Sequence, residues 1–306
     1  MELQVIINQM AVLFIIMAVG FVIGKVKFLT PDSNKLLTRL VLFVALPCTI
    51  LNSVFENEID ITFGDTMYFM LMTMITYGIA FLISIPVIRL LGGDKKNRGL
   101  LSFMSIFSNC GFMGFPVVIA ILGISSAYYV ALFNIPFNIL VFSIGIYMIS
   151  KVSGGFNIKM LLNPVLIVAL LSIPLALIGF KPPQILGDAL KITGSITTPG
   201  GMLVIGSTLA YVPFKTIISE WRIIPVTLLK LIIVPVVTWL VLKQLISNEM
   251  LLGVLVIVSA MPSAAMASML AIEYGGNEKT ASAGVFLTTL LCVLTVPLLV
   301  YLLILI

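Results

Sequence analysis

The sequence contains no histidine, and only 9% of its 306 residues are charged. The absence of histidine excludes Ser-His-Asp triads, HExxH zinc sites and haem with a histidine ligand. Three cysteines, Cys48, Cys110 and Cys292, are far apart in apolar stretches, so they indicate neither a CxxC redox pair nor a disulfide framework. The GxxxxGK[ST] phosphate-binding pattern is also missing. We therefore expect no enzyme, no bound cofactor or metal, and no direct use of ATP.

Apolar residues are in large excess. The hydrophobic fraction is 60% and the mean hydropathy is +1.23, whereas soluble proteins have roughly 45–50% apolar and about 25% charged residues. This composition predicts an all-α integral membrane protein that crosses the cell membrane, or the inner membrane of a bacterium, several times.

Charged residues divide the chain into apolar intervals. A helix needs about 20 predominantly apolar residues to cross the hydrocarbon core. The interval 99–150 is long enough for two spans, and the spans near Arg39 and Lys230 tolerate one long basic side chain each. No basic region precedes the first span, so we expect a permanent helix and not a signal peptide. We predict ten transmembrane helices, at 3–24, 40–55, 66–88, two within 99–150, 160–180, 192–214, 223–242, 250–272 and 280–306.

The distribution of basic residues predicts the orientation. Cytoplasmic loops carry an excess of Lys and Arg. With both termini outside, the outer loops contain Lys181, Lys191 and Lys243, and the first outer loop is acidic. The cytoplasmic side then contains Lys25, Lys27, Lys35, Arg39, Arg89, Lys95, Lys96, Arg98, Lys151, Lys159, Lys215, Arg222 and Lys279. The net charge of +5 therefore reflects membrane topology and not a nucleic-acid partner.

Two five-helix halves are expected, residues 1–150 and 160–306, joined by a cytoplasmic linker at 151–159. An odd number of helices gives the halves opposite orientations, which is the ground plan of many secondary transporters. Proline placement agrees, with Pro47 and Pro116 in the first half and Pro199 and Pro262 in the second. Unrelated proline kinks are the alternative, because proline is frequent in membrane helices.

The predicted fourth and ninth helices contain helix-breaking residues near their middle. Residues 108–116 read SNCGFMGFP and residues 259–268 read SAMPSAAMAS. Unwound backbone at membrane depth requires protein or a water-filled cavity to satisfy it. A helix that restarts after Pro116 or Pro262 would direct its positive N-terminal end at the midplane, which favours an anion. Two kinked helices packed tightly through small residues are the alternative.

Short motifs occur along the whole chain: ALP at 45–47, NCGFMGFP at 109–116, NP at 163–164, SAMPSA at 259–264 and EYGG at 273–276. In their order and spacing they resemble the auxin efflux carrier family, which contains plant auxin exporters and bacterial permeases assigned to malate or malonate. The plant exporters have a long hydrophilic central loop, whereas the linker here is short. The chain is therefore similar to a compact prokaryotic member.

The resemblance implies a fold similar to that of the bile acid/sodium symporters. Helices four and nine would be broken and would cross each other. Helices one, two, six and seven would form a scaffold. Helices three to five and eight to ten would form a mobile transport domain. The mechanism would be elevator-type alternating access, with a small organic anion beside the crossing point. Homodimers through the scaffold helices are also implied. The implied crossing positions are residues 109–116, which include Asn109, Cys110, Gly111, Gly114 and Pro116, and residues 259–263, which include Ser259, Pro262 and Ser263.

Several polar side chains in the predicted spans are candidate ligands. Asn109 would donate its amide to a carboxylate, or would satisfy the opened backbone. Asn134 and Asn138 share one helix face and either line a cavity or join helices. Ser259 and Ser263 would bind the ligand, although hydroxyls in membrane helices more often bond to the preceding turn.

Two ionisable residues are candidates for charge coupling. Lys230 lies eight residues beyond Arg222, a depth of about 12 Å at ~1.5 Å per residue. It would neutralise the substrate or alternate with a coupling cation, or would extend back toward the cytoplasm. Glu273, at the cytoplasmic end of the ninth helix, is the candidate if Na⁺ or H⁺ is coupled.

We therefore predict a secondary transporter of a small organic anion, a carboxylate similar to auxin or malate. A sodium-coupled symporter of the bile acid class is the alternative within transport. Outside the transporter class, the alternatives are a membrane receptor without transport activity and a channel. An intramembrane hydrolase would lack a histidine base.

Overall fold

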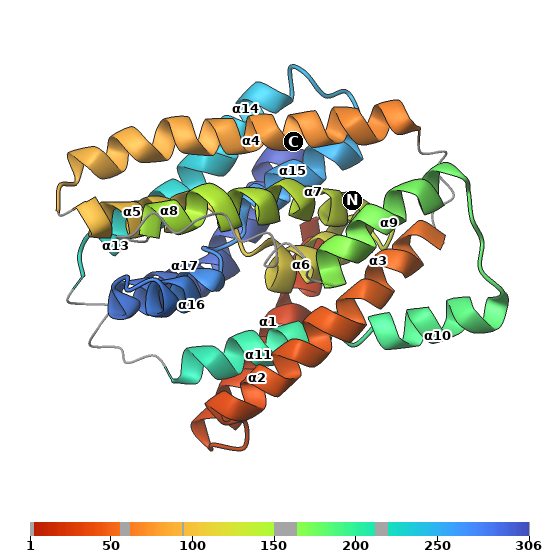
Figure 1. Ribbon diagram of the computed structural model, residues 1–306, viewed down its shortest axis with the longest axis horizontal. Coiled ribbons are helices and arrows are strands. Elements are labelled where there is room, and N and C mark those ends of the chain that lie inside the picture. The colour runs from red at the N-terminus through yellow and green to blue at the C-terminus, as the bar shows by residue number, and fades with distance from the viewer. Residues whose placement is uncertain (1–2, 56–61, 94, 150–163, 212–219, 306) are drawn as a thin grey trace. The chain divides into compact units, whose positions relative to one another are not determined.

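The computed structural model describes residues 3–55, 62–93, 95–149, 164–211 and 220–305 (Figure 1). All regular elements in these ranges are helical, and their one β contact is an isolated antiparallel bridge between Ser108 and Ser263. The predicted all-α class is confirmed for this part of the chain. The predicted linker, 151–159, lies outside the described residues.

Internal contacts group the chain into two units, which we describe separately. The first unit comprises Met1–Leu71, Gly111–Pro136 and Leu162–Tyr211. The second comprises Met72–Cys110, Phe137–Leu161 and Val212–Ile306. Each unit therefore takes segments from both of the predicted sequence halves.

The main helix pairs of the first unit join its first sequence range with its last. Its helix α1 packs along α11, and α3 packs against α9 and α10 (Figure 1). The elements are α1 (Leu3–Lys25), α2 (Pro31–Leu40), the π-helical turn η1 (Val41–Ala45), α3 (Leu46–Phe55), the start of α4 (Phe63–Leu90), most of η2 (Cys110–Gly114), α6 (Phe115–Leu122), the start of α7 (Ser126–Leu140), α9 (Pro164–Leu177), α10 (Gln184–Gly194) and α11 (Thr197–Ala210).

Glycines allow α1 and α11 to approach each other closely. A Cβ atom at Gly206 of α11 would overlap the carbonyl oxygen of Met17 in α1. On the other helix, a Cβ at Gly20 would be 2.6 Å from the carbonyl oxygen of Leu203. Small residues at such contacts are typical of helix pairs in membranes, where close van der Waals packing replaces hydrophobic burial as the force that holds helices together.

Polar side chains join complete helices in the same unit. The buried Thr49 hydroxyl lies 2.9 Å from the carbonyl oxygen of Gly194 and 2.7 Å from the Thr197 hydroxyl. The Asn34 amide donates to the Ser207 hydroxyl over 2.9 Å. These contacts connect α2 and α3 with α10 and α11.

The second unit contains the remaining part of α4 and α7 together with the C-terminal helices. Within it α5 packs against α8, α14 against α15, and α16 against α17 (Figure 1). The other elements are α5 (Lys95–Ile106), η3 (Val141–Gly145), α8 (Ile146–Ile149), α13 (Ile223–Leu228), η5 (Leu229–Ile233), α14 (Val234–Leu242), α15 (Glu249–Ala260), α16 (Met266–Glu273), α17 (Glu278–Val300) and η6 (Tyr301–Leu305).

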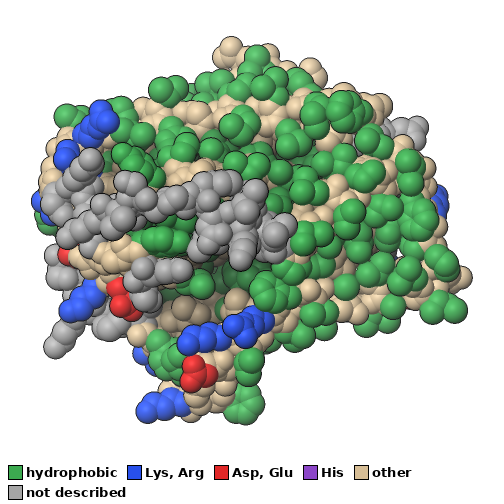
Figure 2. Space-filling view, in the orientation of Figure 1, with side chains coloured by type: hydrophobic (Ala, Val, Ile, Leu, Met, Phe, Trp, Pro, Cys, Tyr) green, Lys and Arg blue, Asp and Glu red, His purple; other side chains and the backbone are tan. Residues whose placement is uncertain are grey.

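Five helical segments of the described chain are long and apolar enough to cross a membrane, namely Pro31–Phe55, Phe63–Leu90, Ser126–Ile149, Ile223–Leu242 and Glu278–Leu303. Four shorter apolar helices are Ala11–Lys25, Cys110–Leu122, Pro164–Leu177 and Glu249–Ala260. Hydrophobic side chains cover most of the face seen in Figure 2, and large ones such as Leu82 and Ile185 are more than three-quarters exposed. A surface with this much exposed apolar area is stable in contact with lipid and not with water. The chain is therefore a multi-pass membrane protein. The count of ten spans stays a prediction.

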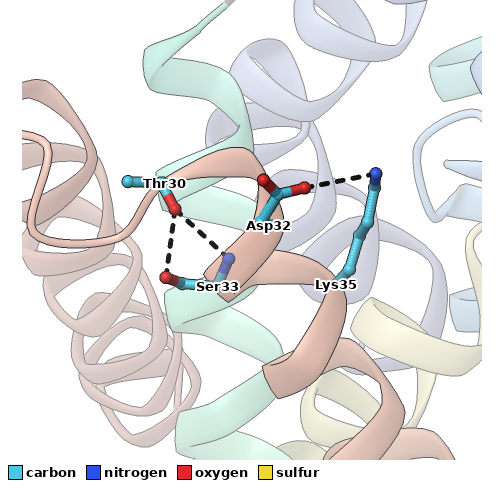
Figure 3. A network of polar contacts seen from close by, with 4 residues as sticks. All are labelled: Thr30, Asp32, Ser33 and Lys35. Carbon is cyan, nitrogen blue, oxygen red and sulfur yellow. Dashed lines mark hydrogen bonds and ion pairs between the residues drawn. The ribbon is translucent and has the colours of Figure 1, made fainter.

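Side-chain caps define several helix starts. At the start of α2, Thr30 accepts from the backbone N–H of Ser33 (Figure 3). Pro31 occupies the first turn. Asp32 and Lys35 form an exposed ion pair at 3.4 Å in the same turn (Figure 3). Asn248 and Asn277 cap α15 and α17 in the same manner. Each cap satisfies N–H groups that have no partner inside the helix.

Candidate functional site

Two helices of the second unit are interrupted. Helix α5 ends at Ile106 and helical structure resumes at Cys110, while α15 ends at Ala260 and α16 begins at Met266. In the second case Met261 is extended, with φ −62° and ψ 150°. It precedes Pro262, whose ring disfavours the helical conformation for the residue before it. We call residues 107–109 and 261–265 the two breaks.

The two breaks are hydrogen-bonded to each other. Ser108 and Ser263 form the antiparallel bridge. The N–H of Asn109 donates to the carbonyl of Pro262 over 2.8 Å, and the N–H of Ala264 donates to the carbonyl of Phe107 over 2.9 Å. Backbone groups released from the helices therefore find partners within the protein, as they must in a membrane.

Helix α17 supports the second break from the side. The Ser263 N–H donates to the Thr288 hydroxyl over 3.2 Å, and the Thr288 hydroxyl donates to the carbonyl of Gly284. The Ser263 hydroxyl donates to the carbonyl of Met104 over 2.7 Å. In a continuous helix the N–H of Ser263 would bond to the carbonyl of Ser259, so this carbonyl is left without its helical donor.

The side chain of Lys230 provides the missing donor. Its Nζ atom lies 3.0 Å from the carbonyl oxygen of Ser259 and 2.6 Å from the Ser108 hydroxyl oxygen. The side chain is completely buried. Among the described residues no carboxylate lies within ion-pair distance of it. The ammonium group thus contacts the first break, at Ser108, and the last turn of α15, which precedes the second break; both contacted oxygen atoms are uncharged.

Aromatic rings enclose the first break. The ring of Phe107 has its centroid 4.7 Å from that of Phe103 and about 6 Å from those of three further rings, which are Tyr77, Phe81 and Phe137. Ring contacts of this kind contribute roughly 0.5–1.5 kcal/mol each beyond the area that they bury. The cluster anchors the position at which α5 ends.

Of the predicted ligands, Asn109, Ser259, Pro262 and Ser263 lie in or next to the paired breaks. The Ser259 hydroxyl already bonds to protein, because it donates to the carbonyl of Val256, one turn earlier. This back-bonding matches the alternative expected for hydroxyls in membrane helices. Asn109 is buried, and its backbone rather than its amide makes the contact to the second break.

The prediction that a helix restarts after Pro116 is wrong. Helical structure already resumes at Cys110 as the π-helical turn η2 and continues directly into α6, where Pro116 is in the first turn. Pro116 is therefore not at a free helix N-terminus, and the wider π turn before it changes the carbonyl pairing. Gly111 and Gly114 are therefore part of η2, in the first unit, and the break precedes them. Pro262, in contrast, lies inside its break.

The remaining candidates are distributed over both units. Asn134 is buried in the first unit and donates its amide to the carbonyl of Val130. Asn138 and Cys110 are buried in the second unit. Glu273 is the last residue of α16, and its side chain lies outside the described part of the structure. In the described chain no group of three His, Cys, Asp or Glu residues is placed to hold a metal ion.

Ser108 and Thr288 were missed as site residues by sequence reasoning. Ser108 directly precedes Asn109 in the motif of the fourth helix, so its position was visible, but nothing in the sequence connects it with Lys230. Thr288 belongs to a Thr-Thr pair in an otherwise apolar segment. A buried hydroxyl pair in a membrane helix is the signal that would have identified it.

In comparisons with known proteins, the chain matches a family of membrane transport proteins and individual transporters. The family model described as "Membrane transport protein" matches residues 5–160 and 148–300. The chain is 24% identical over 306 residues to the transporter YfdV of Escherichia coli K12, with 96% of each chain covered. It is 27% identical to the transporter MJ1031 of Methanocaldococcus jannaschii, covering 94% of this chain and 95% of the relative. A putative malonate transporter of Rhizobium meliloti is 25% identical, covering 87% and 86%.

Proposed function

This chain belongs to the membrane transport protein family of auxin efflux carrier type, as a compact prokaryotic member, and we propose that it is a secondary carrier of a small organic anion. As a member of this family it is a transporter and not an enzyme. The observation that carries the proposal is the pair of hydrogen-bonded breaks in the second unit. Discontinuous helices of this kind form the substrate and ion sites of many secondary transporters.

The buried ammonium of Lys230 supports an anionic substrate. A charge in the membrane interior is costly and is usually found where it serves a ligand or ion path. No described carboxylate balances this charge, so a carboxylate arriving from solution would be attracted to the region. The relative named as a putative malonate transporter supports a short carboxylate in particular.

The proposed mechanism is elevator-type alternating access, in which broken helices four and nine cross at the substrate site. The division of the chain into two units partly supports the proposed division into a scaffold and a transport domain. The predicted scaffold helices one, two, six and seven correspond to α1, α2 with α3, α9 and α11, and all of these are in the first unit. The first unit also contains Gly111–Pro136, which the prediction assigns to the moving domain. We further propose that scaffold helices mediate a homodimer.

Both termini are proposed to lie outside the cytoplasm. In a background without the native cysteines, a cysteine that replaces Lys181 should react with a membrane-impermeant thiol reagent applied from outside. A cysteine that replaces Lys279 should react only after the membrane is opened. The reverse pattern would exclude this orientation.

Uptake into proteoliposomes tests the transport proposal. Vesicles preloaded with unlabelled malonate should accumulate radiolabelled malonate from outside, and excess unlabelled malate or an auxin-like aromatic acid should reveal whether the site prefers other carboxylates by competition. Vesicles without protein are one control, and the uncharged diamide of malonate, which should not compete, is the other. If no carboxylate is exchanged by a protein that is folded in detergent, the proposed function is wrong.

A further inference from the structure

The turn that joins α1 to α2 departs from the usual chemistry of a helix end. The N–H of Phe28 donates to the carbonyl of Ile23, and the N–H of Lys27 donates to the carbonyl of Gly24. These bonds form a Schellman motif, in which the residue at the position of Lys27 is left-handed and is usually glycine. Lys27 has φ 61°, and no other residue of the described chain except glycine has a positive φ. The turn therefore carries a side chain where the backbone favours none.

Apolar side chains of the same turn are exposed. A Schellman motif is frequently closed by an apolar contact between the residues at the positions of Phe28 and Ile23. Here Phe28 is 77% exposed and Val26 is 69% exposed. The turn is nevertheless fixed to the first unit, because the Tyr211 hydroxyl donates to the carbonyl of Leu29 over 2.6 Å. A fixed segment thus presents apolar side chains away from the protein.

Basic residues accompany these apolar side chains. The segment from Lys25 to Arg39 contains four basic residues and one acidic residue, a net charge of +3. The acidic residue, Asp32, pairs with Lys35. In the part of the chain that the structure describes, no carboxylate lies within ion-pair distance of Lys25, Lys27 or Arg39. Figure 2 shows basic side chains in the region where Figure 1 labels α2. Four Lys or Arg residues beside a membrane helix form a cluster of the kind that attracts anionic lipid.

Membrane orientation alone does not explain the position of Lys27. Basic residues orient a helix from any position in a short loop. Lys25 already places a positive charge in the last turn of α1, where it suits the helix dipole. A lysine in the left-handed conformation is disfavoured relative to glycine. A charge at this place, beside an exposed phenylalanine ring, therefore indicates a contact outside the protein.

We infer that residues 25–28, together with Lys35 and Arg39, form a binding surface for anionic phospholipid. The apolar side chains of Val26 and Phe28 enter the boundary between headgroups and acyl chains, and the basic side chains contact the anionic headgroups. Zwitterionic lipid offers the same apolar layer without a net negative charge, so it should bind more weakly. The surface belongs to the first unit, and the inference goes beyond the proposed function because it does not depend on the transported substrate.

Thermal unfolding of the purified full-length protein in detergent tests this inference. The probes are anionic dioleoyl phosphatidylglycerol, zwitterionic dioleoyl phosphatidylcholine, and inorganic phosphate as the free anion. Phosphatidylglycerol at ten times its Kd should raise the unfolding midpoint of the wild type by roughly 3–5 °C, phosphatidylcholine should raise it less, and phosphate should not raise it. Equal stabilisation by the two lipids, or the same stabilisation by phosphate, would contradict the inference.

Lys27→Gly makes the test specific, because it should improve folding and impair lipid binding. Without lipid, glycine relieves the left-handed conformation and should raise the midpoint by roughly 2–4 °C. The apparent Kd for phosphatidylglycerol should increase about fivefold, the loss expected for one lysine at an anionic surface. A lower midpoint without lipid, or an unchanged Kd, would overturn the inference. Lys27→Asn, which also tolerates this conformation, measures the same loss of charge if the glycine variant does not fold.

Two further variants separate the charge from the apolar contact. Phe28→Ala removes apolar area but no charge, so it should weaken the response to both lipids equally. Lys181→Gln is the matched control, since Lys181 is an exposed lysine of the same unit outside the proposed surface. Its responses to both lipids should equal those of the wild type. An equal loss of phosphatidylglycerol binding in Lys181→Gln and Lys27→Gly would show that only net charge matters, and the proposed surface would be wrong.

Discussion

In the first unit, α1 and α11 are continuous helices that approach closely through glycines, and their polar neighbours join one complete helix to another. In the second unit, α5 and α15 stop within the apolar region, and polar groups there replace the hydrogen bonds that the helices have given up. The first arrangement gives rigidity, because backbones in direct contact have little freedom to shift. The second leaves carbonyl and hydroxyl groups at the breaks, where they can respond to a charge. The paired breaks therefore distinguish the second unit, which shares close glycine packing with the first: a Cβ atom at Gly99 of α5 would overlap the carbonyl oxygen of Met148.

The largest effect should come from Gly206→Ala, which removes the close approach in the first unit. The new methyl group overlaps the backbone of Met17, which cannot rotate away as a side chain can. We expect a loss of at least about 3 kcal/mol or complete loss of folded protein, measured by the monodisperse fraction on size exclusion. Gly187→Ala in α10 is the matched control, since its nearest neighbour is 3.8 Å away. Equal yields of the two variants would contradict the proposed packing.

Replacement of a proline in the second unit should impair transport more than folding. Pro262→Ala restores a backbone N–H and releases Met261 from its extended conformation, so α15 can extend into the break. We expect about tenfold slower malonate exchange per folded protein, a change of 1.4 kcal/mol. Pro116→Ala, in the first turn of α6, should change exchange less. A larger loss in Pro116→Ala would mean that the critical break is elsewhere.

A pair of threonine variants compares the two units directly. Thr288→Val leaves the N–H of Ser263 without its acceptor, which should cost about 1–3 kcal/mol and slow exchange. Thr49→Val removes hydroxyl contacts between complete helices and should cost about 1 kcal/mol with unchanged exchange per folded molecule. Thermal midpoints and exchange rates measured together distinguish the two results. If Thr288→Val and Thr49→Val differ in stability but exchange malonate at the same rate, the predicted functional difference between the two units is wrong.

The smallest effect is expected at the surface of the first unit. Lys35→Ala breaks an ion pair whose two side chains are 77% and 91% exposed, and such pairs contribute little in water. The unfolding midpoint and the exchange rate should both equal those of the wild type, whereas Thr30→Ala, which removes the α2 cap, should lower the midpoint slightly. A clear loss in Lys35→Ala would show that this turn makes contacts beyond those of Figure 3.

Hydropathy and charge predicted the helical class and the approximate positions of the five described segments that are long and apolar enough to cross a membrane, because the length of a span follows from the thickness of the hydrocarbon core. They also located the two unusual helices, since proline and small polar residues near the middle of a span are visible in any sequence. The expected start at 192 was less accurate: α10 ends at Gly194 and α11 begins at Thr197, so the interval contains a turn.

The chemistry of the breaks was less predictable. The sequence placed Lys230 deep in a span but did not show where its side chain points. The partners of this side chain, Ser108 and Ser259, are 122 and 29 residues away along the chain. The error at Pro116 has a local cause: a π-helical turn before the proline removes the conflict that normally ends a helix. Pairing of one break with another depends on the whole fold, and no local pattern encodes it.

The buried ammonium of Lys230 has an electrical consequence for the proposed cycle. If the second unit carries this charge across the membrane, the membrane voltage acts on it with about 2.3 kcal/mol per 100 mV. A bound monovalent carboxylate would cancel that charge, and the loaded carrier would cross without regard to voltage. A dianion would leave one net negative charge, so its movement would be driven outward by an inside-negative potential. The valence of the substrate would thus determine which step of the cycle, the movement of the loaded or of the empty carrier, responds to the voltage.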